Sequence, residues 1–237
     1  MAGQWVSLKS EGRVIVEAMN AMAYDALTLG RFDFALGLAN VEERAKEAKF
    51  PFLSANVVTN EGVPFFEPYT IIEREGVRVA ILGLSEANAN QAPGMTGRSQ
   101  VRDYIETASF YVPKLRPEAD VLIVLSHLGF EEDMTLARAV PGIDIIVGGN
   151  TRKLMELPER VGDTVIVQQG YRGEWMGKLA VMYDADGKLA EAQEEMITLG
   201  PDYKDDPEVE AIVAKWRELY PTPTPRPTPT RLETPTR

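Results

Sequence analysis

His127 is the single histidine of this 237-residue chain, and it is the first side chain to consider for chemistry. Imidazole is the side chain that most often transfers protons or ligates metals near neutral pH. His127 lies in the apolar run 120–129, DVLIVLSHLG, which is typical of a strand covered on both faces. One histidine cannot form a multi-histidine metal cluster. A hydrogen-bonded structural histidine is therefore the favoured interpretation, and a metal ligand is the alternative.

The second candidate is the loop 30–37, GRFDFALG, which follows a short strand predicted for 25–30. Glycine at each end permits the sharp strand-to-loop turn on which active-site loops are built. Within the loop only Asp33 could serve as a metal ligand or base. Phe32 and Phe34 could form a stacking platform for a nucleobase or could fill a core pocket, and the pattern favours packing.

The third candidate is the loop GGNTRK, residues 148–153, which follows a buried strand predicted for 142–149. Arg152 in this loop and Arg31 in the previous one could bind an anion such as phosphate or sulfate, if the fold brings them together. The alternative is that both arginines pair with Asp33 and neighbouring carboxylates. This alternative is favoured in a chain with 36 acidic and 25 basic residues.

The composition excludes several classes of function. A net charge of −11 argues against a nucleic-acid surface and against an anionic-membrane patch. The absence of cysteine excludes disulfides, thiolate metal sites and cysteine nucleophiles. No apolar run is long enough for a transmembrane helix or for the core of a signal peptide. If the protein is exported, we expect its signal to have been removed or to lie upstream.

Strands and helices alternate along the chain and are followed by hairpins, which predicts an α/β (α+β) layered domain over residues 1–220. A Glu-Gly turn joins the two strands of 68–85, and an Asp-Gly turn joins those of 177–200. Pro113 should interrupt the helix of 101–119. The other predicted helices are 13–24, 38–50, 131–141 and 205–220, and the other predicted strands are 51–58 and 163–170. The Pro/Thr-rich residues 221–237 indicate a disordered linker or stalk.

Six blocks of this sequence, in order, resemble the 5′-nucleotidase branch of the calcineurin-like metallophosphoesterases. The blocks are VIVEAMNAMAYDALTLG, FPFLSANVV, VRVAILGL, ADVLIVLSHLGFEED, VPGIDIIVGG and VIVQQGYRGEWMGKLAV. The resemblance extends from about Val14 to Tyr220. It implies a four-layer αββα sandwich with two divalent metals at the carboxyl ends of its central strands. It also implies hydrolysis of phosphoric esters such as nucleotides.

The resemblance aligns GRFDFALG with the family motif GNHEFDFG without a gap. Arg31 then stands where the family has a ligating asparagine, and Phe32 replaces the catalytic histidine. Ala35 replaces the aspartate that partners this histidine, and Asp33 replaces the glutamate. The resemblance therefore implies that the acid–base pair is lost, and no catalytic residue is expected.

The other motifs of the family are only partly present. His127 in SHLG occupies a metal-ligand position, whereas Asn150 and Arg152 replace two ligating histidines. The Asp-x-His and Gly-Asp motifs should precede Val14, and MAGQWVSLKSEGR contains neither. We therefore expect the domain to lack its first strand, with the helix at Val14 packed over the sheet. Guanidinium groups at ligand positions disfavour divalent cations, so we expect metal-dependent hydrolysis to be lost.

The leading hypothesis is a non-catalytic binding or structural module that takes a small anion or nucleotide through Arg31, Asp33 and Arg152. No cofactor is expected. Any metal would be a single divalent ion at His127, with Asn150 as a weak second ligand. We expect an extracytoplasmic location by resemblance, with tethering to another domain or the envelope through 221–237. The alternatives are an active phosphohydrolase whose first metal motifs lie outside this chain, and a metal-free enzyme that recognises an anion.

Overall fold

A six-stranded sheet forms the centre of the computed structural model, which describes residues 2–223 except 93, 94, 96 and 186. The spatial order is β4 (Tyr69–Arg74), β5 (Val77–Leu84), β7 (Val121–Ser126), β8 (Ile145–Gly148), β10 (Thr164–Val167) and β9 (Glu159–Val161). The four central strands are parallel to one another, and the two edge strands are antiparallel to their neighbours. Central strands covered on both faces explain the apolar runs of the sequence.

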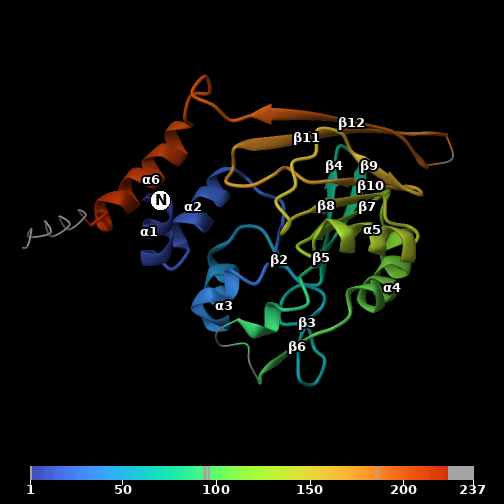
Figure 1. Cartoon of the computed structure of the whole chain (residues 1–237), viewed down its shortest axis with the longest axis horizontal. Helices are drawn as coiled ribbons and strands as arrows, with labels where there is room; N and C mark the ends of the chain where they lie inside the picture. The colour runs from blue at the N-terminus through green and yellow to red at the C-terminus, as the bar shows by residue number, and fades with distance from the viewer. Residues whose placement is uncertain (1, 93–94, 96, 186, 224–237) are drawn as a thin grey trace, which may run out of the picture.

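Helices cover one face of this sheet and a long β-ribbon covers the other (Figure 1). Leu122 and Val124 of β7 face α4 (Tyr104–Leu115) and α5 (Phe130–Ala139) in the largest apolar cluster. Alternate residues of the sheet, such as Val165, pack against Leu179 of the ribbon formed by β11 (Trp175–Tyr183) and β12 (Leu189–Thr198). The predicted α/β class and its metallophosphoesterase-like layering are thus confirmed.

A smaller unit contacts the sheet at strands β5 and β7. Its elements are β1 (Leu27–Thr28), η1 (Asp33–Leu36), α3 (Leu38–Glu47), β2 (Phe52–Leu53), β3 (Val57–Thr59), η2 (Ala89–Gln91) and β6 (Ser99–Val101). β1 and β2 form a parallel pair, and β3 and β6 form an antiparallel pair. β2 contacts the main sheet closely, because a Cβ added to Gly83 of β5 would lie 2.5 Å from Leu53 Cβ. This contact fixes the 30–37 loop relative to the sheet.

Three helices pack together at one end of the molecule (Figure 1). They are α1 (Ala2–Lys9), which the sequence did not predict, α2 (Arg13–Ala21) and α6 (Pro207–Leu219). Glu17 joins α2 to α6, since its carboxylate accepts hydrogen bonds from Lys215 Nζ (2.8 Å) and Trp216 Nε1 (2.6 Å). The principal neighbours of α2 are α1, α3 and α6. The expectation that the helix at Val14 packs over the six-stranded sheet is therefore wrong.

Other predictions of local structure agree with the fold, with one correction. Both hairpins form, and Glu75 and Gly76 adopt the positive φ values that a tight turn between strands needs. Pro113 does not interrupt α4, which continues to Leu115 and is followed by η3 (Arg116–Glu118). In α6, Trp216 is buried and Leu219 is exposed, so the helix packs through the face that carries Trp216. The predicted linker 221–237 lies mostly outside the described residues. Within the described part, no helix is long and apolar enough to cross a bilayer.

Candidate functional site

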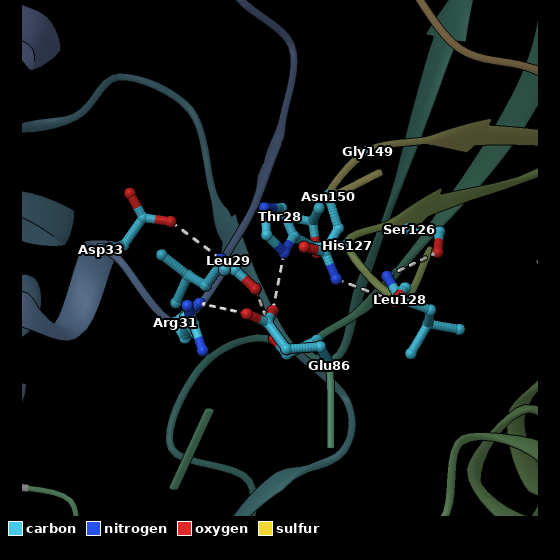
Figure 2. A network of polar contacts seen from close by, with 12 residues as sticks. Thr28, Leu29, Arg31, Asp33, Glu86, Ser126, His127, Leu128, Gly149 and Asn150 are labelled. Carbon is cyan, nitrogen blue, oxygen red and sulfur yellow. Dashed lines mark hydrogen bonds and ion pairs between the residues drawn. The ribbon is translucent and has the colours of Figure 1, made fainter. Parts of the chain in front are cut away.

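The candidate site lies where four strands end at a common edge (Figure 2). Gly30 follows β1, Glu86 follows β5, His127 follows β7 and Asn150 follows β8. Carboxyl ends of parallel strands meet at one edge of a sheet, so loops far apart in the sequence converge there. The structure thus brings together His127, Asn150 and the 30–37 loop, as the resemblance implied, and adds Glu86.

Glu86 and His127 form the central contact of the site. Glu86 Oε2 lies 2.7 Å from His127 Nδ1, and the Arg31 backbone N–H donates to Glu86 Oε1 at 3.0 Å. The Glu86 side chain is buried and that of His127 is partly buried. The hydrogen bond from Glu86 raises the pKa of His127, and burial opposes it more weakly. Burial raises the pKa of Glu86, but the His127 hydrogen bond and charge outweigh it, so this pKa is lowered. Both shifts favour an imidazolium–carboxylate pair.

Gly30 permits this arrangement because it leaves room for the imidazole ring. A Cβ added to Gly30 would lie 2.5 Å from His127 Cε1 and 2.6 Å from Nε2, which is too close for any side chain. The backbone N–H of Gly30 donates to Asp33 Oδ2 at 2.8 Å. Asp33 therefore satisfies a backbone donor of its own loop and stabilises the turn between Gly30 and Asp33.

The two phenylalanines of the loop have different environments. Phe34 is fully buried and packs against Phe66 with ring centroids 6.1 Å apart, which confirms the packing interpretation for this residue. Phe32 is 66% exposed, and the guanidinium of Arg31 lies 4.6 Å from its ring centroid. Packing was the wrong prediction for Phe32, because the 3₁₀ turn that buries Phe34 begins after Phe32 and leaves it on the surface.

The arginines lie against aromatic rings rather than carboxylates. The guanidinium carbons of Arg152 and Arg172 lie 5.5 Å and 5.0 Å from the ring centroid of Tyr171. Among residues 2–223, as far as they are described, neither Arg31 nor Arg152 has a carboxylate oxygen within 4.0 Å. The predicted pairing of these arginines with Asp33 is therefore wrong, since Asp33 is bound to the backbone of its own loop.

A buried glutamine holds the 148–153 loop. Gln168 Oε1 accepts from Thr151 Oγ1 and from the Lys153 N–H, both at 2.8 Å, and Gln168 Nε2 donates to Gly149 O at 2.5 Å. Asn150 has a positive φ of 69°, and its Nδ2 donates to Leu128 O at 3.0 Å. Asn150 thus keeps its carbonyl oxygen and one N–H of its amide for a ligand. Sequence reasoning missed Gln168, whose partners lie 15 to 19 residues away.

A buried carboxyl group lies behind the site. Asp133 on α5 is fully buried; Ser126 Oγ donates to its Oδ1, and its Oδ2 has no hydrogen-bond partner among the described residues. Burial raises the pKa of Asp133 to about 7, although the Ser126 hydrogen bond opposes the shift. Sequence analysis missed this residue too. The sequence does contain a signal for it, because Asp133 lies three residues after Phe130 and three before Leu136, on the buried face of α5.

Comparison with known proteins places this geometry in a family. The chain is 30% identical over 232 residues to the snake venom 5′-nucleotidase of Crotalus adamanteus, an alignment that covers 87% of the chain and 40% of the relative. The crystal structure of a 5′-nucleotidase precursor from Thermus thermophilus superposes with a TM-score of 0.82 at 27% identity, covering 90% of the chain and 46% of that structure. The calcineurin-like phosphoesterase YfkN of Bacillus subtilis gives a TM-score of 0.77 at 27% identity, with coverages of 92% and 77%.

The chain belongs to the 5′-nucleotidase-like branch of the calcineurin-like metallophosphoesterases. It spans about two fifths of the length of the curated 5′-nucleotidases that it matches. No protein-family model matches the chain. The resemblance of the six sequence blocks is confirmed at the level of the family.

The side chains of this metallophosphoesterase domain do not fit the dinuclear metal centre of its family. In the described part of the chain, no three His, Asp or Glu side chains are arranged to hold a metal ion. His127 Nδ1 is bound to Glu86, which leaves Nε2 as the one imidazole nitrogen for a metal. The motif alignment puts Arg31 and Arg152 in the place of ligands, and a guanidinium about 4 Å from a divalent cation costs on the order of several kcal/mol. Asn150 offers one neutral oxygen, which transition metals bind less well than imidazole.

Proposed function

We propose that this domain does not hydrolyse phosphoesters by the metal-dependent route of its family and works as a binding module. The observation that carries the proposal is that the described residues hold no group of three or more His, Asp or Glu side chains that could bind a metal ion. The hydrogen bond between Glu86 and His127 Nδ1 leaves Nε2 as the one imidazole nitrogen for a metal, and one nitrogen cannot hold a dinuclear centre. Phe32, at the position of the family's catalytic histidine, can neither donate nor accept a proton.

The ligand of the proposed module is a small anion, such as a phosphate group or a nucleotide. Its binding groups are Arg31 and Arg152, whose guanidinium groups have no carboxylate partner within 4.0 Å among the described residues. Arginine offers several N–H donors in a planar fork, which suits phosphate oxygens. The exposed Phe32 ring and the Tyr171 ring lie beside these groups and offer faces for a planar base.

An active phosphohydrolase is the alternative, because the chain spans only about 40% of relatives that are named 5′-nucleotidases. In that case polypeptide outside these 237 residues supplies the remaining ligands, and His127 binds the metal through Nε2 while Glu86 orients the ring. A metal-free enzyme that uses Asp33 as a base has less support. The Asp33 carboxylate accepts a 2.8 Å hydrogen bond from Gly30 N–H, and no nucleophile lies within hydrogen-bonding distance of it in the described structure.

The location that we propose is extracytoplasmic. It is supported by the relationship to venom 5′-nucleotidases, which are components of a secretion by name. The described residues 221–223 begin the Pro/Thr-rich stretch, which we propose connects the domain to another domain or to the cell envelope.

Two measurements on the 237-residue protein test this proposal. The first is phosphate release from a nucleoside monophosphate with added Mn²⁺ or Co²⁺, compared with the Phe32→Ala variant. We expect no difference, and release above that of Phe32→Ala would contradict the proposal. The second is calorimetric titration with inorganic phosphate and with the nucleotide. Arg152→Ala should weaken binding about tenfold, the effect of losing one charge-assisted hydrogen bond, whereas Arg138→Ala, an exposed arginine on α5, should not. Equal affinities of the two variants would exclude Arg152 from the site.

A further inference from the structure

Two arginines, Arg152 and Arg172, lie against the same tyrosine beside the candidate site. Their guanidinium carbons are 5.5 Å and 5.0 Å from the ring centroid of Tyr171, so the two groups are no farther apart than the sum of these distances. All three side chains are exposed to solvent. Arg152 belongs to the proposed anion site, and the position of Arg172 extends this site by a second guanidinium.

Two direct contacts join the loops that carry these arginines. The Gly170 N–H donates a hydrogen bond to Lys153 O at 2.9 Å, and Leu154 forms an antiparallel β-bridge with Gln169. The backbones of the two arginines are therefore held close together before any ligand binds. Such preorganisation lowers the entropic cost of binding.

The backbone is strained at both arginines. The φ angle is 57° at Arg152 and 66° at Arg172, in the left-handed region that disfavours any residue with a Cβ. Asn150 also has a positive φ, of 69°, so these two loops contain three of the six non-glycine residues with positive φ in the described chain. Glycine would adopt the same conformation without strain. Strained residues of this kind cluster at ligand sites, where the side chain has a use that outweighs the strain.

Hydrogen-bond donors of both arginines remain available to a ligand. Among the described residues, the backbone N–H groups of Arg152 and Arg172 have no acceptor, and neither guanidinium has a carboxylate oxygen within 4.0 Å. Glu174, the acidic residue of the same loop as Arg172, is exposed and forms no ion pair with either arginine. A guanidinium carries several N–H donors in a rigid fork. Two such forks with two backbone donors exceed what the oxygens of one phosphate group can accept.

We propose that Arg172 is a binding residue of this site and that, together with Arg152, it selects ligands with two linked phosphate groups, such as inorganic pyrophosphate or a nucleoside diphosphate. Each guanidinium binds one phosphate group, and cation–π contact with the Tyr171 ring holds both guanidinium groups in place. A single phosphate group leaves one guanidinium without a partner and therefore binds more weakly. This inference rests on the proposed function, because it concerns the same anion site.

Calorimetric titrations of the 237-residue protein with inorganic phosphate and with inorganic pyrophosphate, both without metal ions, test this inference. The parent should bind pyrophosphate about tenfold more tightly than phosphate, the ratio expected from one additional charge-assisted hydrogen bond. Arg172→Ala should abolish this preference with little effect on the affinity for phosphate. Arg217→Ala removes the same charge from an exposed position on α6 and should keep the preference. This control separates direct contact from the change in net charge.

The outcomes distinguish this inference from the proposed function. If phosphate binds but pyrophosphate binds no more tightly, or if the preference survives Arg172→Ala, then Arg172 does not select the ligand and the proposed anion site still stands. Binding of neither anion would overturn both.

Thermal unfolding of a second variant tests the strained backbone. Arg172→Gly removes the guanidinium and also relieves the positive φ. It should lose the pyrophosphate preference and unfold at a higher temperature than Arg172→Ala. A lower unfolding temperature than that of Arg172→Ala would contradict the strain at this position.

Discussion

The carboxylate of Glu86 and the imidazole of His127, 41 residues apart in the sequence, form a partly buried pair joined at 2.7 Å. The pair lies at the ends of β5 and β7, and it gives His127 a partner that does not depend on a cation. Its consequences can be measured with little ambiguity, because His127 is the only histidine in the chain.

Replacement of Glu86 by glutamine should lower the pKa of His127. The hydrogen bond and the negative charge of Glu86 raise this pKa, so their loss should lower it. A proton NMR titration of the single imidazole gives the value directly. Glu156→Gln, at an exposed position in the 150–160 segment, serves as the control and should leave the pKa unchanged. An unchanged value in Glu86→Gln would mean that the pair does not form in solution.

The same pair should make a pH-dependent contribution to stability. The pKa of His127 is raised from 6.5, so its contribution is fully present below pH 6.5 and is lost as the pH rises through the folded value. The pKa of Glu86 is lowered from 4.5, so its contribution is present above pH 4.5 and is lost as the pH falls through the folded value. Urea unfolding should therefore show the largest difference between the parent protein and Glu86→Gln between pH 4.5 and 6.5. A difference that is constant from pH 3 to 9 would contradict this assignment.

Gly30→Ala should destabilise the protein by about 1–3 kcal/mol, the usual cost of forcing atoms into a packed site. The added methyl group would lie 2.5 Å from His127 Cε1, so the ring must move and its bond to Glu86 must weaken. Denaturant unfolding measures the first effect, and a fall in the His127 pKa measures the second. Gly200→Ala is the matched control, because nothing lies within 4 Å of its added Cβ and its φ is not positive. Equal stabilities of the two variants would refute the close approach.

In the parent protein, the free energy of unfolding should fall as the pH rises, and the Asp133→Asn substitution should abolish this fall. The folded pKa of about 7 lies above the unfolded value of 3.8, so the unfolded chain ionises first and stability falls between these pH values. The variant should therefore gain a few kcal/mol relative to the parent between pH 4 and pH 8. Thermal or urea unfolding at the two pH values gives the comparison. Asp202→Asn alters an exposed position and serves as the control. The pH dependence of its stability should be the same as that of the parent. A parallel profile for Asp133→Asn would show that this carboxyl is not buried.

Gln168→Ala should release the 148–153 loop without unfolding the sheet. The substitution removes the acceptor of the Lys153 N–H and of Thr151 Oγ1, at a cost of about 1–3 kcal/mol. Amide hydrogen exchange at Lys153 should become faster, while exchange in β7 should not change. Gln193→Ala, on the exposed side of β12, should affect neither. Unchanged exchange at Lys153 would mean that another group holds this loop.

Much of the fold could be predicted from the sequence, because each element carries its own local pattern. The apolar runs of β5, β7 and β8 and the glycine turns of the two hairpins lie within single segments of the chain. Helix α1 has no such signal, since its apolar residues show little helical periodicity and its packing partners lie on α2 and α6. Pro113 was expected to break α4, yet it removes only one backbone hydrogen bond, and the buried side chains of Val112 and Leu115 hold the last turn.

The candidate site was predictable only where a motif of the family could be aligned. That alignment placed His127 and Asn150 correctly at the edge where the strands end. It could not identify Glu86, Gln168 or Asp133, because none of them stands at a ligand or acid–base position of the aligned motifs and each acts through contacts that only the folded chain creates. The exposure of Phe32 was missed for the same reason, since the direction of a 3₁₀ turn decides which of two neighbouring phenylalanines faces the core.

The most direct test of the central claim is the metal content of the protein purified without chelator and measured by plasma mass spectrometry. The account predicts no stoichiometric transition metal bound to these 237 residues, because one imidazole nitrogen remains for a metal and the motif alignment puts arginines in the place of ligands. Two equivalents of a divalent transition metal per chain would contradict it.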